Sequence, residues 1–228
     1  TELNLAPIPA ILIQSMRCIG YTLETALADI IDNSITAGAT RISVQFRWNG
    51  GDPWVAILDN GCGMSASELR EAMRFGGDLA PSDKRDAHDL GRFGLGLKTA
   101  SLSQCRRLTV VSKKEGKINV LEWDVDYLAK TKSAEWCVRI PSVKEVQNKK
   151  VCTSLCEELD KATSATLVLW RNLDALLSDE KRKATEEQFT EAMARVSDHI
   201  ALVFHRFLAP EEPGRKAVKM DFNKTHVK

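Results

Sequence analysis

Apolar residues recur at helical spacing in two segments near the start of the chain. Residues 8–20 carry an apolar face and predict a short helix that ends at Gly20. Residues 22–37 predict a longer helix, with Thr22 as its N-cap residue and Gly38 as its C-terminal stop. Helical structure is therefore expected from residue 8 onward.

Strands and further helices are predicted after this pair. Residues 41–48 alternate apolar and polar side chains, which is typical of a strand with one buried face, and a short strand follows over residues 54–59. A capping-box pattern opens a third helix over residues 65–75. Farther on, the pattern predicts strands over 107–112, 118–125, 135–140 and 166–170, a long helix over 180–208, and a last strand over 217–222. This order predicts a layered α/β domain.

One long segment has no period. Residues 76–92 are polar and rich in glycine and aspartate, and helical character returns only with the residues that follow. A connection of this length inside a compact domain is usually functional or disordered.

Composition narrows the class of protein without naming a partner. The 228 residues are 43% hydrophobic, so a sizeable core is available, and 32 basic residues balance 31 acidic ones. That balance gives no general argument for binding nucleic acid or a membrane surface. The six cysteines lack zinc-ligand spacing, and no stretch is apolar enough for a membrane span or a signal peptide. We therefore expect a reduced, cytoplasmic protein that makes no membrane contact.

The predicted helix over residues 22–37 contains an unexpected polar group. Asp29, Asp32 and Asn33 stand among isoleucines, and residues three or four apart share a helix face. They form either a solvated stripe or the lining of a site, and this segment alone does not separate the two.

The sequence ILDNGCGM, residues 57–64, is a second candidate. A buried strand would deliver Asp59 to its end, where the carboxylate could accept a hydrogen bond from an exocyclic amine. Gly61 and Gly63 would let backbone approach a ligand closely, and Met64 offers a polarizable surface to a flat ring. A plain Asn-Gly turn between strands is the alternative.

A third candidate is GRFGLGLKTAS, residues 91–101. Gly91, Gly94 and Gly96 precede a predicted helix, and free backbone amides at a helix start attract phosphate oxygens. The spacing matches neither a P-loop nor a dinucleotide-binding fingerprint.

In this order, the three motifs resemble the N, G1 and G2 boxes of the GHKL superfamily, which includes gyrase B, MutL, the large heat-shock chaperones and histidine kinase catalytic domains. SATLVLWRNL, residues 164–173, is similar to the later strand of that family. Within the superfamily, the chain most resembles the MORC-like ATPases and their bacterial relatives, over about residues 8–208.

The resemblance implies a fold and a domain plan. The fold would be a two-layer sandwich of helices on a mixed sheet, the Bergerat-type nucleotide-binding fold. Residues 1–209 would be the ATP-binding domain, with 1–8 as an N-terminal arm that could be exchanged between subunits and 76–92 as a lid over ATP. Residues 210–228 would form a linker and the first strand of a truncated second domain.

The resemblance also implies roles for single residues. Asn33 would coordinate magnesium, and Asp59 would accept a hydrogen bond from adenine. Asp29 stands where hydrolysing members carry a glutamate that activates water, so its side chain is one methylene shorter than theirs. Lys98 is the candidate phosphate cation, against the alternative of an exposed helix residue. The other implied nucleotide contacts are Gly61, Gly63, Met64, Gly91, Phe93, Gly94, Leu95, Gly96, Leu97, Thr99 and Thr166.

The implied function is a magnesium-dependent, ATP-binding and slowly hydrolysing domain. Lid closure and nucleotide-dependent homodimerisation would drive a larger protein, through downstream domains of the same chain. The client, DNA or protein, stays open. The alternatives are a histidine-kinase-type catalytic domain and a non-catalytic module that responds to nucleotide.

Overall fold

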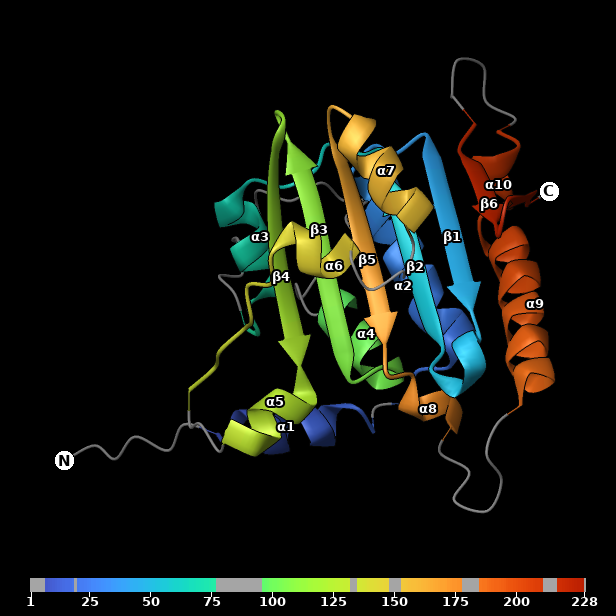
Figure 1. Ribbon diagram of the computed structural model, residues 1–228. Coiled ribbons are helices and arrows are strands. Elements are labelled where there is room, and N and C mark those ends of the chain that lie inside the picture. The colour runs from blue at the N-terminus through green and yellow to red at the C-terminus, as the bar shows by residue number, and fades with distance from the viewer. Residues whose placement is uncertain are drawn as a thin grey trace, which may run out of the picture.

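A single mixed sheet organises the protein (Figure 1). The computed structural model describes residues 7–18, 20–76, 96–131, 135–147, 153–177, 185–210 and 217–227. The seven strands run in the order β4-β3-β5-β2-β1-β6-β7. β1 and β6 are parallel, and the other neighbouring pairs are antiparallel. The strands are β1 (Arg41–Arg47), β2 (Trp54–Asp59), β3 (Arg107–Lys114), β4 (Lys117–Asp124), β5 (Ala165–Arg171), β6 (Lys219–Phe222) and β7 (Thr225–His226).

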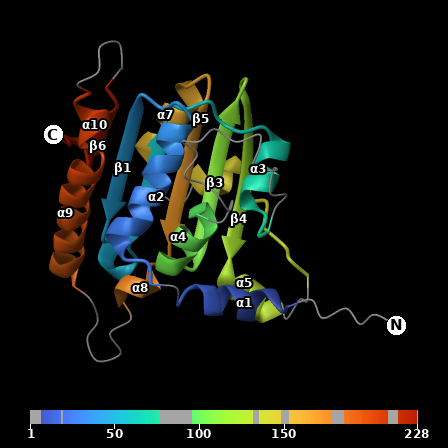
Figure 2. The same cartoon turned by 180° about the vertical axis from the view of Figure 1, so that it is seen from behind.

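Helices α2 (Leu23–Thr36) and α4 (Gly96–Gln104) pack together on one face of the sheet (Figure 2). Helix α9 (Glu186–Val203) lies beside α2, near β1. Their apolar stripes and the side chains of this sheet face form the larger core, which includes the fully buried Ile31 and Met193. This arrangement is the helix-on-sheet layering that the sequence predicts, and the fold agrees with the Bergerat type.

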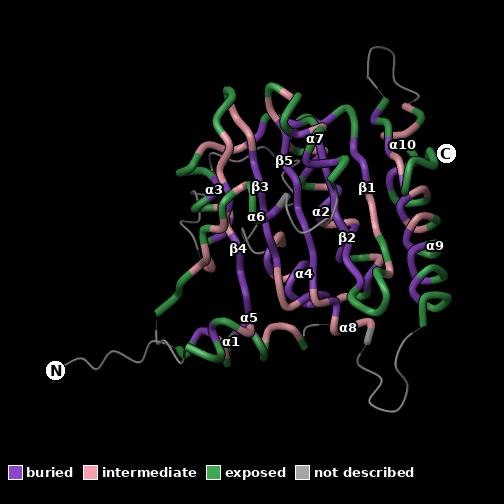
Figure 3. The backbone as a smooth tube through the Cα atoms, viewed as in Figure 1, coloured by how far each residue is buried: buried purple, intermediate pink, exposed green. Residues whose placement is uncertain are grey.

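The second face of the sheet carries helices that the sequence analysis did not predict. They are α6 (Val143–Gln147) and α7 (Thr153–Lys161). Leu155 and Leu159 of α7 pack with Leu167 of β5 in a smaller core. Central strands β2 and β5 are buried along their whole length, because side chains cover both of their faces (Figure 3).

Short helices complete the described fold. α1 and α5 lie against each other at one end of the sheet, and α3 packs beside β4. The bounds are α1 (Pro9–Met16), α3 (Ala66–Met73), α5 (Val125–Thr131), α8 (Asp174–Leu177), α10 (His205–Leu208) and the 3-10 turn η1 (Asn49–Gly51). No helix in these described ranges has the length and apolar character that crossing a membrane requires.

The local helix signals are confirmed. The Thr22 hydroxyl accepts a hydrogen bond from the backbone N–H of Thr25 at the start of α2. Ser65 and Glu68 form the capping box of α3, and Gly38 follows α2 with a φ of +76°. Each of these end structures provides hydrogen bonds to backbone groups that a helix end would otherwise leave unpaired.

Three predicted elements differ from the structure. Helix α1 ends at Met16 and not at Gly20. The strand expected over 135–140 is reduced to one bridge, between Arg139 and Glu122. Pro141 occupies the next pairing position and has no N–H to give, so the ladder stops there. The helix expected over 180–208 consists, within the described residues, of α9 and α10, which meet at Phe204.

The last predicted strand lies in the same sheet as the others. β6 pairs in parallel with β1, and the N–H of Val218 donates to the carbonyl of Phe207. These residues extend the sheet formed by the preceding strands, and the division into a first domain and a linker with a second domain stays a prediction. Residues 1–6 of the predicted arm and 77–92 of the predicted lid lie outside the described residues.

Candidate functional site

A pocket of about 260 Å³ opens between the sheet and the helices α2 and α4. Side chains of α2, the segment after β2, the start of α4 and the inner face of β3 and β5 meet there. The lining residues are Ile30, Asn33, Ser34, Ala37, Asp59, Cys62, Gly63, Met64, Ala72, Gly96, Leu97, Val110, Thr166 and Val168. The first, second and third motifs and the later strand thus converge on one cavity. Its walls are largely apolar and suit a flat ring.

Asp59 places a carboxylate in the floor of this pocket. Asp59 is the last residue of β2 and is only 5% exposed. Oδ2 accepts a hydrogen bond of 3.0 Å from Ser34 Oγ, and Oδ1 accepts one of 2.9 Å from the N–H of Gly61. Burial raises the pKa of Asp59 to about 6, against the opposing effect of these donors and of the Thr166 N–H. Asp59 is therefore a buried acceptor, fixed in orientation before any ligand arrives.

Thr166 belongs to a short chain of hydroxyl groups beside Asp59. Its Oγ1 lies 2.9 Å from Ser112 Oγ, on the neighbouring strand β3. The same Ser112 oxygen accepts a hydrogen bond of 2.8 Å from the N–H of Met64. Ser112 thereby ties the loop after β2 to β5 and holds Met64 at the pocket wall.

The glycines of the second motif are in close contact with other parts of the protein. A Cβ on Gly61 would stand 2.9 Å from that of Ala37, at the end of α2. A Cβ on Gly63 would stand 1.9 Å from the carbonyl oxygen of Lys113, and its φ of +65° also disfavours a side chain. The loop therefore packs closely against α2 and β3, and Gly63 lines the pocket.

Asp29 lies at the junction of α2 and α4. Tyr21 donates a hydrogen bond of 2.8 Å to its Oδ2. The same oxygen is 3.9 Å from the position that a Cβ on Gly96 would occupy. One helical turn farther along α2, Asn33 is exposed and lines the pocket, while Asp32 is half-buried. Asn33 therefore lines the pocket, whereas Asp29 is outside the lining and stands next to Gly96, which does line it.

Lys98 and Thr99 are not among the residues that line the pocket. Lys98 is 1% exposed, and its Nζ donates a hydrogen bond of 2.8 Å to the carbonyl of Ala72 in α3. Burial lowers the pKa of Lys98 to about 8, and Glu71 opposes that shift. The Thr99 side chain hydrogen-bonds the phenol of Tyr21.

Several predicted site residues line the pocket, together with others that were not predicted. The predicted residues in the lining are Asn33, Asp59, Gly63, Met64, Gly96, Leu97 and Thr166. The predicted residues Asp29, Gly61, Lys98 and Thr99 are described but lie outside the lining. Gly91, Phe93, Gly94 and Leu95 lie outside the described residues. Sequence reasoning missed Ser34, Ser112 and Tyr21. Ser34 lies within the first motif and could have been found from its helix position, because it shares the face of Ile30. Ser112 and Tyr21 carry no local signal.

The part of the sequence that contains these motifs matches a known protein family. Residues 21–166 match the family described as histidine kinase-, DNA gyrase B-, and HSP90-like ATPases. The chain belongs to this ATPase family. The matched range begins at Tyr21 and ends at Thr166, so it contains every residue of the pocket lining except Val168.

Individual relatives of this ATPase family resemble shorter parts of the chain. ATPase morc-1 of Caenorhabditis elegans is 32% identical over 97 residues, which is 42% of this chain and 11% of that protein. The mouse MORC family CW-type zinc finger protein 1 is 34% identical over 122 residues, 51% of this chain and 12% of that protein. The DNA mismatch repair protein MutL of Erwinia tasmaniensis is 33% identical over 92 residues, 40% of this chain and 15% of that protein. The chain therefore spans a small part of each relative.

Family membership assigns the pocket its general chemistry. This is a GHKL-type ATPase domain, distantly related to MORC ATPases and MutL. Membership of this family implies that the domain binds ATP. The acceptor at Asp59 and the apolar walls fit an adenine ring, which presents an amine at its edge and needs flat contacts on its faces.

Proposed function

We propose that the domain binds ATP together with magnesium in the Asp59 pocket and hydrolyses it slowly. The observation that carries this proposal is the buried carboxylate of Asp59. Two of its hydrogen bonds come from Ser34 and Gly61 inside the protein, and the residue still lines the pocket. A ligand with an amine at this position gains an acceptor that needs no further reorganisation.

The magnesium ion would be held mainly by phosphate oxygens and water. Within the described residues there is no cluster of three His, Cys, Asp or Glu that could hold a metal by itself. Mg²⁺ accepts such a site, because it keeps several waters and takes few protein oxygens. The exposed amide of Asn33, in the pocket lining, suits one of these positions. When bound, the ion supplies positive charge that offsets the phosphate charge.

Asp29 is the proposed general base. Its carboxylate would orient a water whose oxygen attacks the γ-phosphorus, while the bond to the β-phosphate oxygen breaks and ADP leaves. The proton of the water passes to Asp29 and then to solvent. The contact with Tyr21 and the nearness of Gly96 support this role, since they fix the carboxylate where the first and third motifs meet.

Lid closure and dimerisation are part of the same proposal. Residues 76–92 would close over ATP, and two domains would associate in the closed state to drive a larger protein. Lid closure and dimerisation are supported by the resemblance of the motifs before and after this segment to the G1 and G2 boxes of the GHKL superfamily. The proposed phosphate contact of Lys98 would require its ammonium to leave Ala72.

Calorimetric titration with ATP, ADP and GTP in the presence of magnesium tests the proposal. ATP is expected to bind at least about tenfold more tightly than GTP, because guanine presents a carbonyl where adenine presents its amine. Equal affinities would contradict the adenine assignment. Phosphate release at saturating ATP then separates the alternatives. Tight binding with no release indicates a nucleotide-responsive module, and transfer to a protein histidine indicates a kinase.

A further inference from the structure

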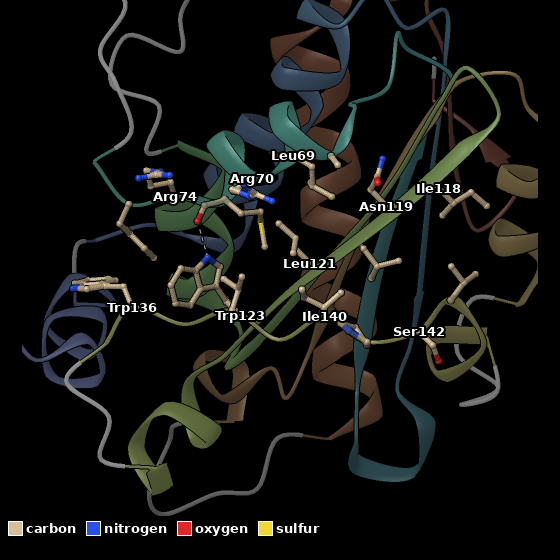
Figure 4. A pocket seen from close by; sticks show the side chains of 17 residues that line it. Leu69, Arg70, Arg74, Ile118, Asn119, Leu121, Trp123, Trp136, Ile140 and Ser142 are labelled. Atoms are coloured by element: carbon tan, nitrogen blue, oxygen red, sulfur yellow. Dashed lines mark hydrogen bonds between the residues drawn. The ribbon is translucent and has the colours of Figure 1, made fainter.

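A second and larger cavity, of about 650 Å³, lies on the other side of α3 from the nucleotide pocket. It is a groove along β4, with α3 on one side and residues 136–143 on the other. Figure 4 shows Leu69 and Arg70 of α3 on one side of β4, and Ile140 and Ser142 on the opposite side. No residue lines both this groove and the nucleotide pocket. The groove is therefore a separate site in the described part of the chain.

The floor of the groove is the edge of the sheet. β4 is the outermost strand, and its neighbour β3 occupies only one of its sides. The N–H and C=O of Glu122 face outward and bond with Arg139, at 2.9 Å each. Because a strand alternates with a period of two residues, the N–H and C=O of Val120 and Ile118 face the same way. Among the described residues these two have no backbone partner on that side.

Proline explains why the chain does not complete the pairing itself. Continuing the antiparallel bridge would set residue 141 opposite Val120, and Pro141 has no N–H. Ser142 then caps α6, with its hydroxyl accepting a hydrogen bond from the N–H of Glu145. The sheet edge beside Val120 and Ile118 stays open as a result. An open edge of this kind is a template for an added strand.

The walls of the groove specify side-chain chemistry. Trp123 and Trp136 form one end with Phe75, their ring centroids 5.2 to 6.2 Å apart. Trp136 is 36% exposed and Ile140 is 79% exposed, so the side formed by residues 136–143 presents apolar surface to solvent.

The charged side chains of the lining have one sign. Within the described residues, Arg70 and Arg74 line the groove and no carboxylate does. Arg74 forms an exposed ion pair with Glu71, at 3.2 Å. Arg70 forms no ion pair with a described residue. Arg70 and Leu121 both line the groove (Figure 4).

We propose that this groove binds an extended peptide segment of a partner protein, which adds as a strand to the edge of β4. Backbone hydrogen bonds to Ile118 and Val120 supply part of the affinity. Alternate side chains of the peptide are apolar and occupy the space beside Trp136 and Ile140. One carboxylate of the peptide pairs with Arg70. This surface adds a peptide-binding activity to the ATPase domain.

Three blocked seven-residue peptides test the proposal. Each alternates valine with polar residues and carries a glutamate at its second, fourth or sixth position, with threonine at the other polar positions. They are titrated into isotopically labelled protein, and backbone amide shifts are followed by NMR. At least one peptide is expected to saturate, with the largest shifts at Ile118 and Val120. N-methylation of its alternate amides is expected to weaken binding about tenfold or more, because each methyl group removes one backbone hydrogen bond.

Charge reversal supplies the second arm. Arg70→Glu is expected to lower the affinity for the glutamate peptide by about threefold to tenfold. It is expected to raise the affinity for the same peptide with lysine in place of glutamate by a similar factor. Lys219→Glu is the matched control. Lys219 is also exposed and lies in β6, near the opposite edge of the sheet from β4, so this change should alter neither affinity.

Several results would overturn the proposal. They are the absence of saturable shifts at millimolar peptide, equal binding of the N-methylated peptide, and unchanged affinities in Arg70→Glu. Concentration-dependent shifts of Ile118 and Val120 without peptide would assign the edge to a second copy of this chain. Shifts there with a single-stranded oligonucleotide, but with none of the peptides, would assign the groove to nucleic acid.

Discussion

The phenol of Tyr21 donates a hydrogen bond of 2.8 Å to Oδ2 of Asp29, eight residues along the chain. Tyr21 in turn interacts with Thr99 of α4, so α2 and α4 are joined at the proposed base. Burial, followed by the interaction with Asp29, raises the pKa of Tyr21 above its ordinary value of 10.0. The phenol therefore keeps its proton throughout the neutral range, and Asp29 keeps its donor.

Replacing Tyr21 by phenylalanine tests whether this donor positions Asp29. Tyr21→Phe keeps the ring and removes only the hydroxyl. We expect kcat to fall about tenfold, because a base that can rotate reaches the water less often, while the Kd for ATP stays within about twofold. Steady-state phosphate release and calorimetry measure the two.

The matched control is the other tyrosine of the chain. Tyr127 is exposed on α5, away from the pocket, and Tyr127→Phe should change neither quantity. A Tyr21→Phe variant with normal kcat would show that Asp29 needs no such donor. A variant that loses ATP affinity as strongly as kcat would assign Tyr21 a structural role.

Asp59→Asn separates ligand binding from folding at one residue. The new amide nitrogen can donate to Ser34 Oγ, whose own hydrogen can go to the carbonyl of Ile30, at 3.2 Å. The contacts with Ser34 and Gly61 can therefore survive, but an amine on the ligand meets a donor. We expect ATP affinity to fall by about tenfold to a hundredfold, which corresponds to roughly 1–3 kcal/mol for a buried hydrogen bond that is lost.

The raised pKa of Asp59 gives the wild type a pH-dependent stability that the Asp59→Asn variant lacks. The folded protein holds the Asp59 proton up to a pH of about 6, against 3.8 for the unfolded chain. Protonation thus stabilises the fold fully below 3.8, and that stabilisation is lost as the pH rises through 6. Between pH 5 and 8, the wild type should lose about 1 kcal/mol of unfolding free energy relative to Asp59→Asn.

Urea unfolding without nucleotide measures this difference at the two pH values. Nucleotide must be absent, because phosphate groups titrate in the same range. Parallel stability curves for the two proteins would mean that Asp59 is not desolvated in the free domain.

The fold could be predicted to the extent that its signals were local. The cap at Thr22, the box at Ser65 and Glu68, and the alternation in β1 depend on neighbours in sequence, and the structure confirms them. Helices α5, α6 and α8 have too few turns to show a period. Whether residues 135–140 pair along their length depends on Pro141 and the edge of β4, which no local pattern reveals.

The sequence predicts which motifs form the candidate site, but it does not predict the contacts that hold their side chains in place. Its motifs converge on one pocket, as expected from the resemblance. The partners that fix them are distant in sequence. Ser34 reaches Asp59 across 25 residues, and Ser112 reaches Met64 across 48. Lys98 shows the limit most clearly, because its direction depends on how α4 packs against α3, and its Nζ bonds with Ala72.

Gly63→Ala tests the close packing of the loop after β2. A Cβ at this position would stand 1.9 Å from the carbonyl oxygen of Lys113, and backbone would have to move. We expect a loss of about 2 kcal/mol or more in unfolding free energy, and weaker ATP binding because Met64 moves with the loop. Gly38→Ala is the control, since φ is +76° there and no atom lies within 4 Å of the new Cβ. It should cost only about 1 kcal/mol and leave affinity unchanged. Equal losses in the two variants would mean that the loop around Gly63 adapts freely.

Lys98→Met decides between a structural and a phosphate-binding lysine. In the structure the ammonium is buried, bonds with the carbonyl of Ala72 and lies 5.9 Å from the Phe75 ring centroid. Its pKa is lowered to about 8 from 10.5, so the unfolded chain binds the proton more tightly. The wild type should therefore gain stability as the pH rises from 8 toward 10.5, and Lys98→Met should lack that gain.

Comparing unfolding free energies at pH 7.5 and 9.5 should show a difference on the order of 1–2 kcal/mol between the two proteins. If Lys98 acts only through α3, the ratio of ATP to adenosine affinity stays within about twofold of the wild-type ratio, because no phosphate contact is lost. A loss of affinity for ATP that adenosine does not share would show that the ammonium leaves Ala72 when nucleotide binds. The pH-dependent stability of the free protein and the phosphate contact of the bound one would then belong to the same side chain, and Lys98 would couple α3 to the occupancy of the pocket.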